Sequence, residues 1–128
     1  MKVAVVFDHT ALSGLGAGTR FLSRMVDRAH YEPNRYVYAP ALCLVAAVAD
    51  RRGLADHVGA LPALEVLDLG YAAASAVGEL VAAEVDWRLA HAVQAATPNA
   101  EWPQGLPVVT GAPDLYAPWR VATIPFSP

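Results

Sequence analysis

Asp8 is the residue of this sequence best placed for chemistry, because it directly follows the apolar run Val3 to Phe7. A run of β-branched and aromatic residues is typical of a strand that is buried on both faces of a parallel sheet. Open parallel sheets bind ligands outside the carboxyl ends of their strands, so a carboxylate at this position has a functional interpretation. The structural alternative is that the Asp8 side chain caps the helix that follows it.

The glycine-rich stretch Gly14 to Gly18 lies several residues beyond Asp8. Its spacing is not G-x-G-x-x-G, and its glycines do not begin at the turn after the strand. We therefore do not interpret it as a dinucleotide-binding loop that cradles phosphate. The stretch leaves open a third hypothesis, in which the same cleft binds a small ligand or a nucleotide.

Composition limits the class of protein. The 128 residues are 55% hydrophobic and 16% charged, which predicts one domain over residues 1–128 and excludes intrinsic disorder as the main state. The net charge of -3 argues against a broad basic surface that binds duplex DNA. The apolar excess in so small a domain predicts an exposed apolar surface and therefore a partner interface.

Cysteine usage and the N-terminal residues bear on the compartment. The single cysteine, Cys43, lies in the apolar run Pro40 to Ala46, which predicts a buried thiol and a reducing environment. The first apolar stretch ends at Asp8 and is too short for a signal peptide. No run approaches the roughly 20 apolar residues that a membrane helix requires. We expect a cytoplasmic protein that does not span a membrane.

The elements that must position Asp8 follow from hydrophobic spacing. Leu22, Met25 and Val26 recur at helical spacing, with arginines on the opposite face, so an amphipathic helix is expected over about residues 20–30. Further helices are expected over residues 40–52, 54–61, 71–85 and 86–96, and further strands over residues 64–69, 107–110 and 121–126. Strands separated by helices predict an α/β domain with a parallel sheet.

Four strings along the chain carry a more specific pattern: Val5–Leu12, which contains Asp8 and Thr10, then Tyr38–Leu44, Leu89–Ala96 and Val108–Leu115. In this order they resemble segments of the PIN domain, the fold of Mg²⁺-dependent ribonucleases that includes the toxins of many bacterial toxin–antitoxin pairs. The resemblance spans nearly the whole chain. It implies a three-layer α/β sandwich, with a central, mostly parallel sheet of four or five strands flanked by helices.

The residues at the metal-binding positions of this family depart from its pattern. Active members bind Mg²⁺ or Mn²⁺ through three or four carboxylates, and the metal activates water for attack on a phosphodiester. Here the glutamate position falls on Ala46, the helix aspartate on His91 and the third aspartate on Ala112. Asp8 matches the first aspartate, and Asp114 matches a secondary acidic position two residues beyond Ala112.

The resemblance implies roles for the residues that remain. Asp8 and Asp114 are the candidate catalytic carboxylates, and Thr10 and Thr110 are the candidate substrate-binding hydroxyls. One alternative set of ligands consists of Asp8, His91 and Asp114, which would form a mixed nitrogen and oxygen site suited to Mn²⁺ or Zn²⁺.

Other interpretations stay open for the same region. In a second alternative, the carboxylate of Glu84 or Asp86, just before the helix that contains His91, substitutes for a missing metal ligand. In the structural alternative, His91 is a neutral imidazole that hydrogen-bonds to Asp8 across the emptied site. Aromatic side chains either stack on bases or pack in the core or a dimer contact; they are Trp87, Trp102, Trp119 and Tyr116.

Two functional hypotheses follow from the depleted carboxylate cluster. In the first, the chain is a PIN-like domain that is catalytically inactive and acts as a binding or regulatory module, with no metal or weakly bound Mg²⁺ or Mn²⁺. Its partner is then a second copy in a homodimer, or another protein of antitoxin-like or regulatory type. In the alternative, the chain is a toxin-type, Mg²⁺- or Mn²⁺-dependent endoribonuclease with an atypical site, and its partner is RNA.

Overall fold

The computed structural model describes residues 1–127, and its central element is the strand β1 (Val3–Phe7). Five parallel strands form one sheet in the order β3-β2-β1-β4-β5. The other strands are β2 (Arg35–Pro40), β3 (Leu64–Leu67), β4 (Val108–Thr110) and β5 (Thr123–Pro125). The predicted α/β fold with a central parallel sheet is confirmed.

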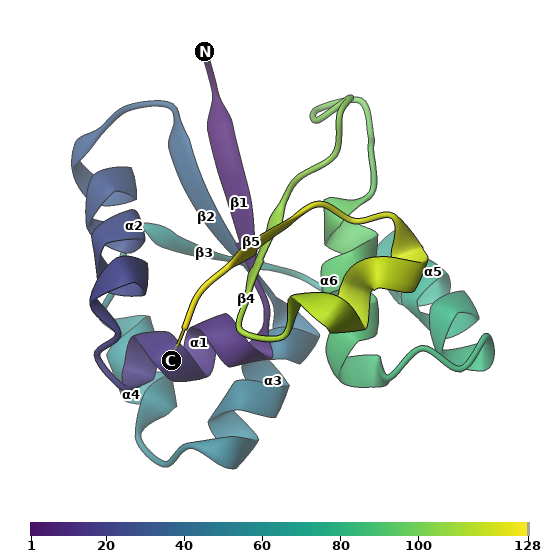
Figure 1. Ribbon diagram of the computed structural model, residues 1–128, viewed down its shortest axis with the longest axis horizontal. Coiled ribbons are helices and arrows are strands. Elements are labelled where there is room, and N and C mark those ends of the chain that lie inside the picture. The colour runs from purple at the N-terminus through teal and green to yellow at the C-terminus, as the bar shows by residue number, and fades with distance from the viewer. Residues whose placement is uncertain (128) are drawn as a thin grey trace.

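Helices cover both faces of this sheet (Figure 1). Seven helical segments are described: α1 (His9–Gly16), α2 (Arg20–Tyr31), α3 (Ala41–Asp50), α4 (Leu54–Gly59), α5 (Tyr71–Ala82), α6 (Trp87–Ala96) and the 3-10 helix η1 (Pro113–Trp119). Figure 1 shows α2 on one side of the sheet and α5 and α6 on the other. Helices α1, α3 and α4 gather near the carboxyl end of β1.

The core is built around β1 because its apolar side chains are enclosed on both faces. Val6 and Phe7 are fully buried, and Val6 pairs with Tyr38 on β2 and with Val108 on β4. All three residues of β4 are also buried. The continuous apolar run therefore gives a central strand, as its sequence predicts.

Helix α1 is the main element that hydrophobic spacing does not predict, because it contains two glycines. A Cβ atom on Gly14 would lie 2.7 Å from Cδ1 of Leu22, and one on Gly16 would lie 2.5 Å from Cδ1 of Leu54. A larger residue at either position would force the facing leucine side chain to shift where α1 packs against α2 and α4. The glycine-rich stretch thus serves close helix packing.

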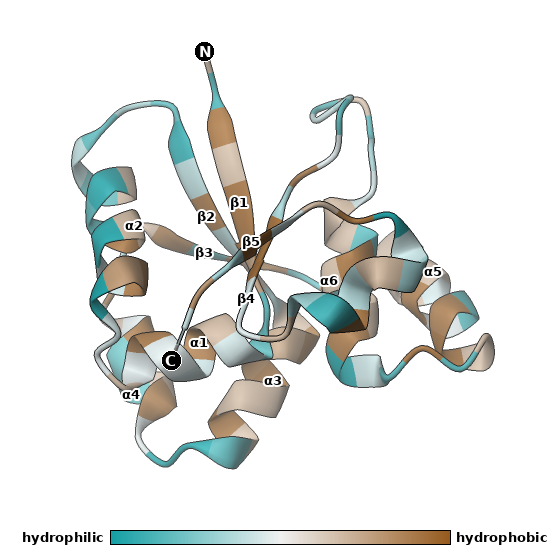
Figure 2. Cartoon of the chain, in the orientation of Figure 1, coloured by the Kyte–Doolittle hydropathy of each residue, from teal (hydrophilic) through white to brown (hydrophobic). Residues whose placement is uncertain are grey.

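Helix α5 is the most weakly embedded of the long helices. Val77 is the single buried residue among its twelve, all of which the structure describes. Its outward side carries Tyr71 and Val81, which are both exposed. Figure 2 shows that α5 is nevertheless largely apolar. None of the helices within residues 1–127 is long and apolar enough to cross a membrane.

Candidate functional site

Asp8 lies at the carboxyl end of β1, and its side chain is the N-cap of α1. One carboxylate oxygen, Oδ1, accepts a hydrogen bond from the Ala11 amide at 3.0 Å and another from the Thr10 hydroxyl at 2.6 Å. The residue is 0% exposed. The helix-capping interpretation of Asp8 is thereby confirmed, and a buried carboxylate of this kind requires further donors for its second oxygen.

Tyr116 supplies that second donor from η1. Its hydroxyl donates a hydrogen bond to Oδ2 of Asp8 at 2.8 Å, and its side chain is also 0% exposed. Burial raises the pKa of Tyr116 well above its usual value, and the Asp8 carboxylate raises it further. The phenol therefore stays protonated and remains a donor. Both oxygens of Asp8 are engaged by groups of the protein itself.

The two predicted threonines lie beside Asp8 and join β4 to α1. Their hydroxyl oxygens are 3.3 Å apart. The Gly111 amide donates to Thr10 Oγ1 at 2.9 Å, and the Ala112 amide donates to Thr110 Oγ1 at 3.0 Å. The structure thus brings Asp8, Thr10 and Thr110 together. Their polar atoms hydrogen-bond to one another and to the backbone of the turn after β4.

His91 lies on α6 and is only 1% exposed. Its Nδ1 atom accepts a hydrogen bond at 3.2 Å from the Leu42 amide, in the first turn of α3. The imidazole is therefore bonded to α3 and not to Asp8, unlike in the structural alternative derived from the sequence. An accepting Nδ1 places the ring proton of the neutral imidazole on Nε2. Burial lowers the pKa of His91 and so favours this neutral form.

The remaining candidate acids lie on the surface. Asp114 is exposed in the first turn of η1. Asp86 is exposed and caps α6 by accepting from the Arg88 amide at 2.9 Å, and Glu84 is exposed before it. Within residues 1–127, no three side chains of His, Cys, Asp or Glu are grouped closely enough to hold a metal ion. Asp8, His91 and Asp114 therefore do not form a metal-binding group in this arrangement.

Cys43 adds a neutral group to the surroundings of Asp8. The thiol is buried, as its apolar context predicts, and it donates to the Arg88 carbonyl at 3.7 Å. Burial raises the pKa of Cys43, and the Asp8 carboxylate raises it further. A thiol held in its protonated form is neither a metal ligand nor a nucleophile.

A crevice does exist outside the carboxyl ends of β1 and β4, where open parallel sheets bind ligands. It has a volume of about 440 Å³, and its walls include His9, Thr10, Gly111 and Phe126. The Asp8 side chain lies beneath this surface and does not line the crevice. The residue of greatest chemical interest is therefore separated from the space in which a ligand would lie.

The sequence identifies Tyr116 only as one of four aromatic residues that either stack on bases or pack in the core or a dimer contact. It does not connect Tyr116 with Asp8. Its partner, Asp8, lies 108 positions earlier, and no short-range spacing connects the two. No protein-family model matches the chain, and no curated protein is significantly similar to it.

Proposed function

We propose that this chain is a PIN-like domain whose metal site has become a hydrogen-bonded core, and that it acts as a binding module instead of a nuclease. The parallel sheet with β1 at its centre, and helices on both faces, is compatible with that family. The four family-like strings follow the same order along the chain as these elements. The observation that carries the proposal is the hydrogen bond between Tyr116 and Asp8, which are both fully buried.

The residues present do not fit the Mg²⁺ or Mn²⁺ that active family members bind. Hard cations need several oxygen ligands with positioned negative charge. Asp8 has protein donors on both of its oxygens, and the neighbouring family positions carry Ala46 and Ala112. His91 has committed its Nδ1 atom to α3. We therefore derive no hydrolytic step for this protein.

The outward side of α5 supports a binding role, and we propose a second copy of this chain as its occupant. This side carries Tyr71 and Val81 and is formed mainly by small, uncharged residues between them. Glu79 is the one charged residue of the helix. Two copies can pack this largely uncharged side together in a twofold dimer, because Glu79 is the single charge that each α5 helix contains.

The experiment that tests the proposal is a calorimetric titration of the purified protein with Mn²⁺, accompanied by an RNA cleavage assay in the same buffer. We expect no saturable Mn²⁺ binding at millimolar metal and no Mn²⁺-dependent cleavage. Asp8→Asn and Asp114→Asn are measured beside the wild type. Saturable binding or cleavage that disappears in Asp8→Asn would overturn the proposal and establish the nuclease.

A second variant keeps the test informative if Asp8→Asn does not fold. Tyr116→Phe removes the donor to Asp8 Oδ2 and retains the carboxylate. If the phenol is what closes the site, this variant gains Mn²⁺ affinity relative to the wild type. Cleavage that is already present in the wild type, and unchanged in Tyr116→Phe, contradicts the proposal.

A further inference from the structure

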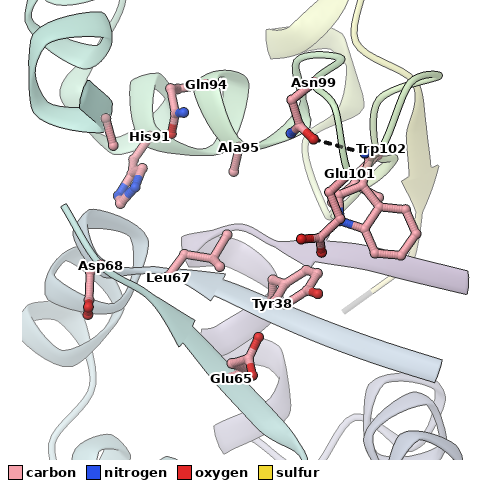
Figure 3. A pocket seen from close by; sticks show the side chains of 12 residues that line it. Tyr38, Glu65, Leu67, Asp68, His91, Gln94, Ala95, Asn99, Glu101 and Trp102 are labelled. Carbon is pink, nitrogen blue, oxygen red and sulfur yellow. Dashed lines mark hydrogen bonds between the residues drawn. The ribbon is translucent and has the colours of Figure 1, made fainter. Parts of the chain in front are cut away.

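A second cavity lies between the sheet and α6, on the face opposite α2 (Figure 3). Its volume of about 340 Å³ falls within the range of sites that bind small molecules. Tyr38 on β2 and Leu67 on β3 form its floor, and Gln94 and Ala95 of α6 form its roof. None of these residues belongs to the Asp8 region described above.

Three carboxylates line this cavity: Glu65, Asp68 and Glu101. No lysine or arginine lines it in the part of the chain that the structure describes. Burial raises the pKa of Tyr38, and the charges of Glu101 and Glu65 raise it further, so both carboxylates act on the same space. Like charges around one cavity destabilise one another, and a bound cation relieves this repulsion.

The spacing of these carboxylates favours an organic cation over a metal ion. A metal needs its ligands to converge on one point, and no group of three acidic, histidine or cysteine side chains among residues 1–127 does so. Figure 3 shows Asp68, Glu65 and Glu101 spread around the cavity. An organic cation, such as an ammonium compound, is large enough to interact with carboxylates that are separated in this way.

His91 gives the site a second requirement. Its imidazole projects from α6 into the cavity, on the side of Asp68 (Figure 3). Because Nδ1 accepts from the Leu42 amide, the proton lies on Nε2, which is not one of the buried polar atoms without a partner among residues 1–127 and so faces the space of the cavity. A ligand that fills the cavity displaces the water available to this N–H group. A ligand that satisfies it must offer an acceptor, such as a hydroxyl oxygen.

The end wall of the cavity is fixed in position by hydrogen bonds of its own loop. Trp102 lies edge-on to Tyr38, with ring centroids 6.5 Å apart. Asn99 Oδ1 accepts from the Trp102 amide at 2.8 Å, and the Asn99 amide donates to the Trp102 carbonyl at 3.0 Å. Lys2 lies against the Trp102 ring without lining the cavity. The site is therefore preformed, with its acidic side chains unneutralised.

From these observations we infer that the cavity binds a small hydroxylated ammonium compound, of the chemical class of the amino sugars. The ammonium group lies among Glu65, Asp68 and Glu101, and a hydroxyl oxygen accepts from Nε2 of His91. The inference deepens the proposed binding function and rests on it. It gives the module a small-molecule ligand in a cavity that α5 borders through Ala73 and that does not include the exposed Tyr71 and Val81.

The test is a calorimetric titration of the full chain with glucosamine in an amine-free phosphate buffer. We expect saturable 1:1 binding of glucosamine, with Kd below about 1 mM, and no binding of glucose, which has the same ring without the charge. 1,4-Diaminobutane supplies ammonium groups without a hydroxyl acceptor, so it should bind at least about tenfold more weakly. Equal binding of glucosamine and glucose, or no binding of glucosamine, overturns the inference.

Charge-matched variants locate the site. Asp68→Asn and Glu101→Gln affect exposed side chains and should each weaken glucosamine binding about tenfold. Asp27→Asn removes the same charge from the exposed side of α2, outside the cavity, and should leave the affinity unchanged. An equal loss in Asp27→Asn would mean that only the net charge of the protein attracts the amine, which contradicts the inference.

The two proposals fail separately. Mn²⁺ binding that depends on Asp8 would overturn the proposed function, whatever glucosamine does. If the protein binds neither glucosamine nor Mn²⁺, the inferred ligand is wrong, and the proposal of an inactive PIN-like domain is unaffected.

Discussion

At the scale of single residues, the protein is organised around a buried carboxylate that is satisfied by its own chain. Asp8 accepts from the Thr10 hydroxyl, the Ala11 amide and the Tyr116 hydroxyl. A buried charge without partners is strongly destabilising, so each of these donors contributes to folding. The carboxylate that the sequence singles out as a candidate metal ligand therefore has a structural role here.

Tyr116→Phe tests that role. The substitution leaves Asp8 Oδ2 buried without a donor, and we expect the free energy of unfolding to fall by about 1–3 kcal/mol. Urea denaturation followed by circular dichroism measures this change. Tyr31→Phe is the matched control, because the Tyr31 side chain is 81% exposed on α2, outside the proposed α5 interface, and its loss of a hydroxyl should leave stability unchanged. Equal stability of the wild type and Tyr116→Phe would show that the hydrogen bond is unimportant.

His91 gives the protein a dependence of stability on pH. Burial lowers its pKa below the usual 6.5, so above that pH the imidazole is neutral in both the folded and the unfolded state. As the pH falls through 6.5, the unfolded chain binds a proton that the folded protein does not, and the free energy of unfolding decreases. The contribution of His91 to the free energy of unfolding is thus fully present above pH 6.5 and declines below it.

We expect His91→Gln to lose less stability than the wild type when the pH falls from about 7 to about 5. Urea denaturation at a series of pH values measures the two slopes. His57 is exposed on α4, and His57→Gln should keep the wild-type slope. A His91→Gln slope equal to that of the wild type would contradict the assignment of the pH dependence to His91.

At the scale of elements, the loop between α6 and β4 shows how backbone conformation positions side chains. Gly105 has a φ of 75°, and its amide donates to the Trp102 carbonyl at 2.9 Å. A Cβ atom at this position would lie 2.5 Å from the carbonyl oxygen of Ala96, a backbone atom at the end of α6. Glycine here allows the loop to bring Trp102 and Glu101 against β2.

Gly105→Ala should therefore lower the free energy of unfolding by about 1–3 kcal/mol. It should also change the fluorescence of the folded protein, because Trp102 is held by this loop. Gly78→Ala on α5 is the matched control: nothing lies within 4 Å of the added methyl group. In a helix that change should raise stability by about 0.5–1 kcal/mol. A stable Gly105→Ala protein with unchanged fluorescence would refute the role given to this loop.

The sequence predicts most of these elements because their apolar residues repeat with a clear period. The helix expected over residues 20–30 is α2 (Arg20–Tyr31), and the strand expected over residues 107–110 is β4 (Val108–Thr110). Helix α1 escapes such prediction, since its glycines lower helix propensity and are explained only by contacts with other helices. Strand β2 (Arg35–Pro40) is not among the strands expected from the sequence, and its pairing with β1 and β3 defines it.

The candidate site is less predictable than the fold for the same physical reason. Thr10 lies two residues from Asp8, so local spacing connects them, and the strand pattern brings Thr110 to the same sheet end. The partners of the buried groups come instead from distant segments. Leu42 is 49 positions from His91, and Tyr116 is 108 positions from Asp8. Periodicity along the chain contains no information about such pairs.

At the scale of the whole molecule, α5 presents an apolar side that the domain itself does not cover. We expect sedimentation equilibrium to detect a dimer at micromolar concentrations. Tyr71→Glu places a charge on this side and should shift the protein to monomer without unfolding it. Tyr31→Glu is the matched control, because Tyr31 is 81% exposed on α2, on the other side of the sheet. A wild-type protein that is monomeric throughout this range would contradict the dimer.

The strand order has a consequence for the chain as it leaves the ribosome. Val6 pairs with Tyr38 soon after it is made, but its other neighbour, Val108, is translated about one hundred residues later. Until then β1 has an open edge, and the Asp8 carboxylate lacks the Tyr116 hydroxyl. Exposed strand edges associate with other chains. Nascent or truncated chains that end before Val108 are therefore the form of this protein most in need of chaperones, because β4 and η1 complete the core around β1.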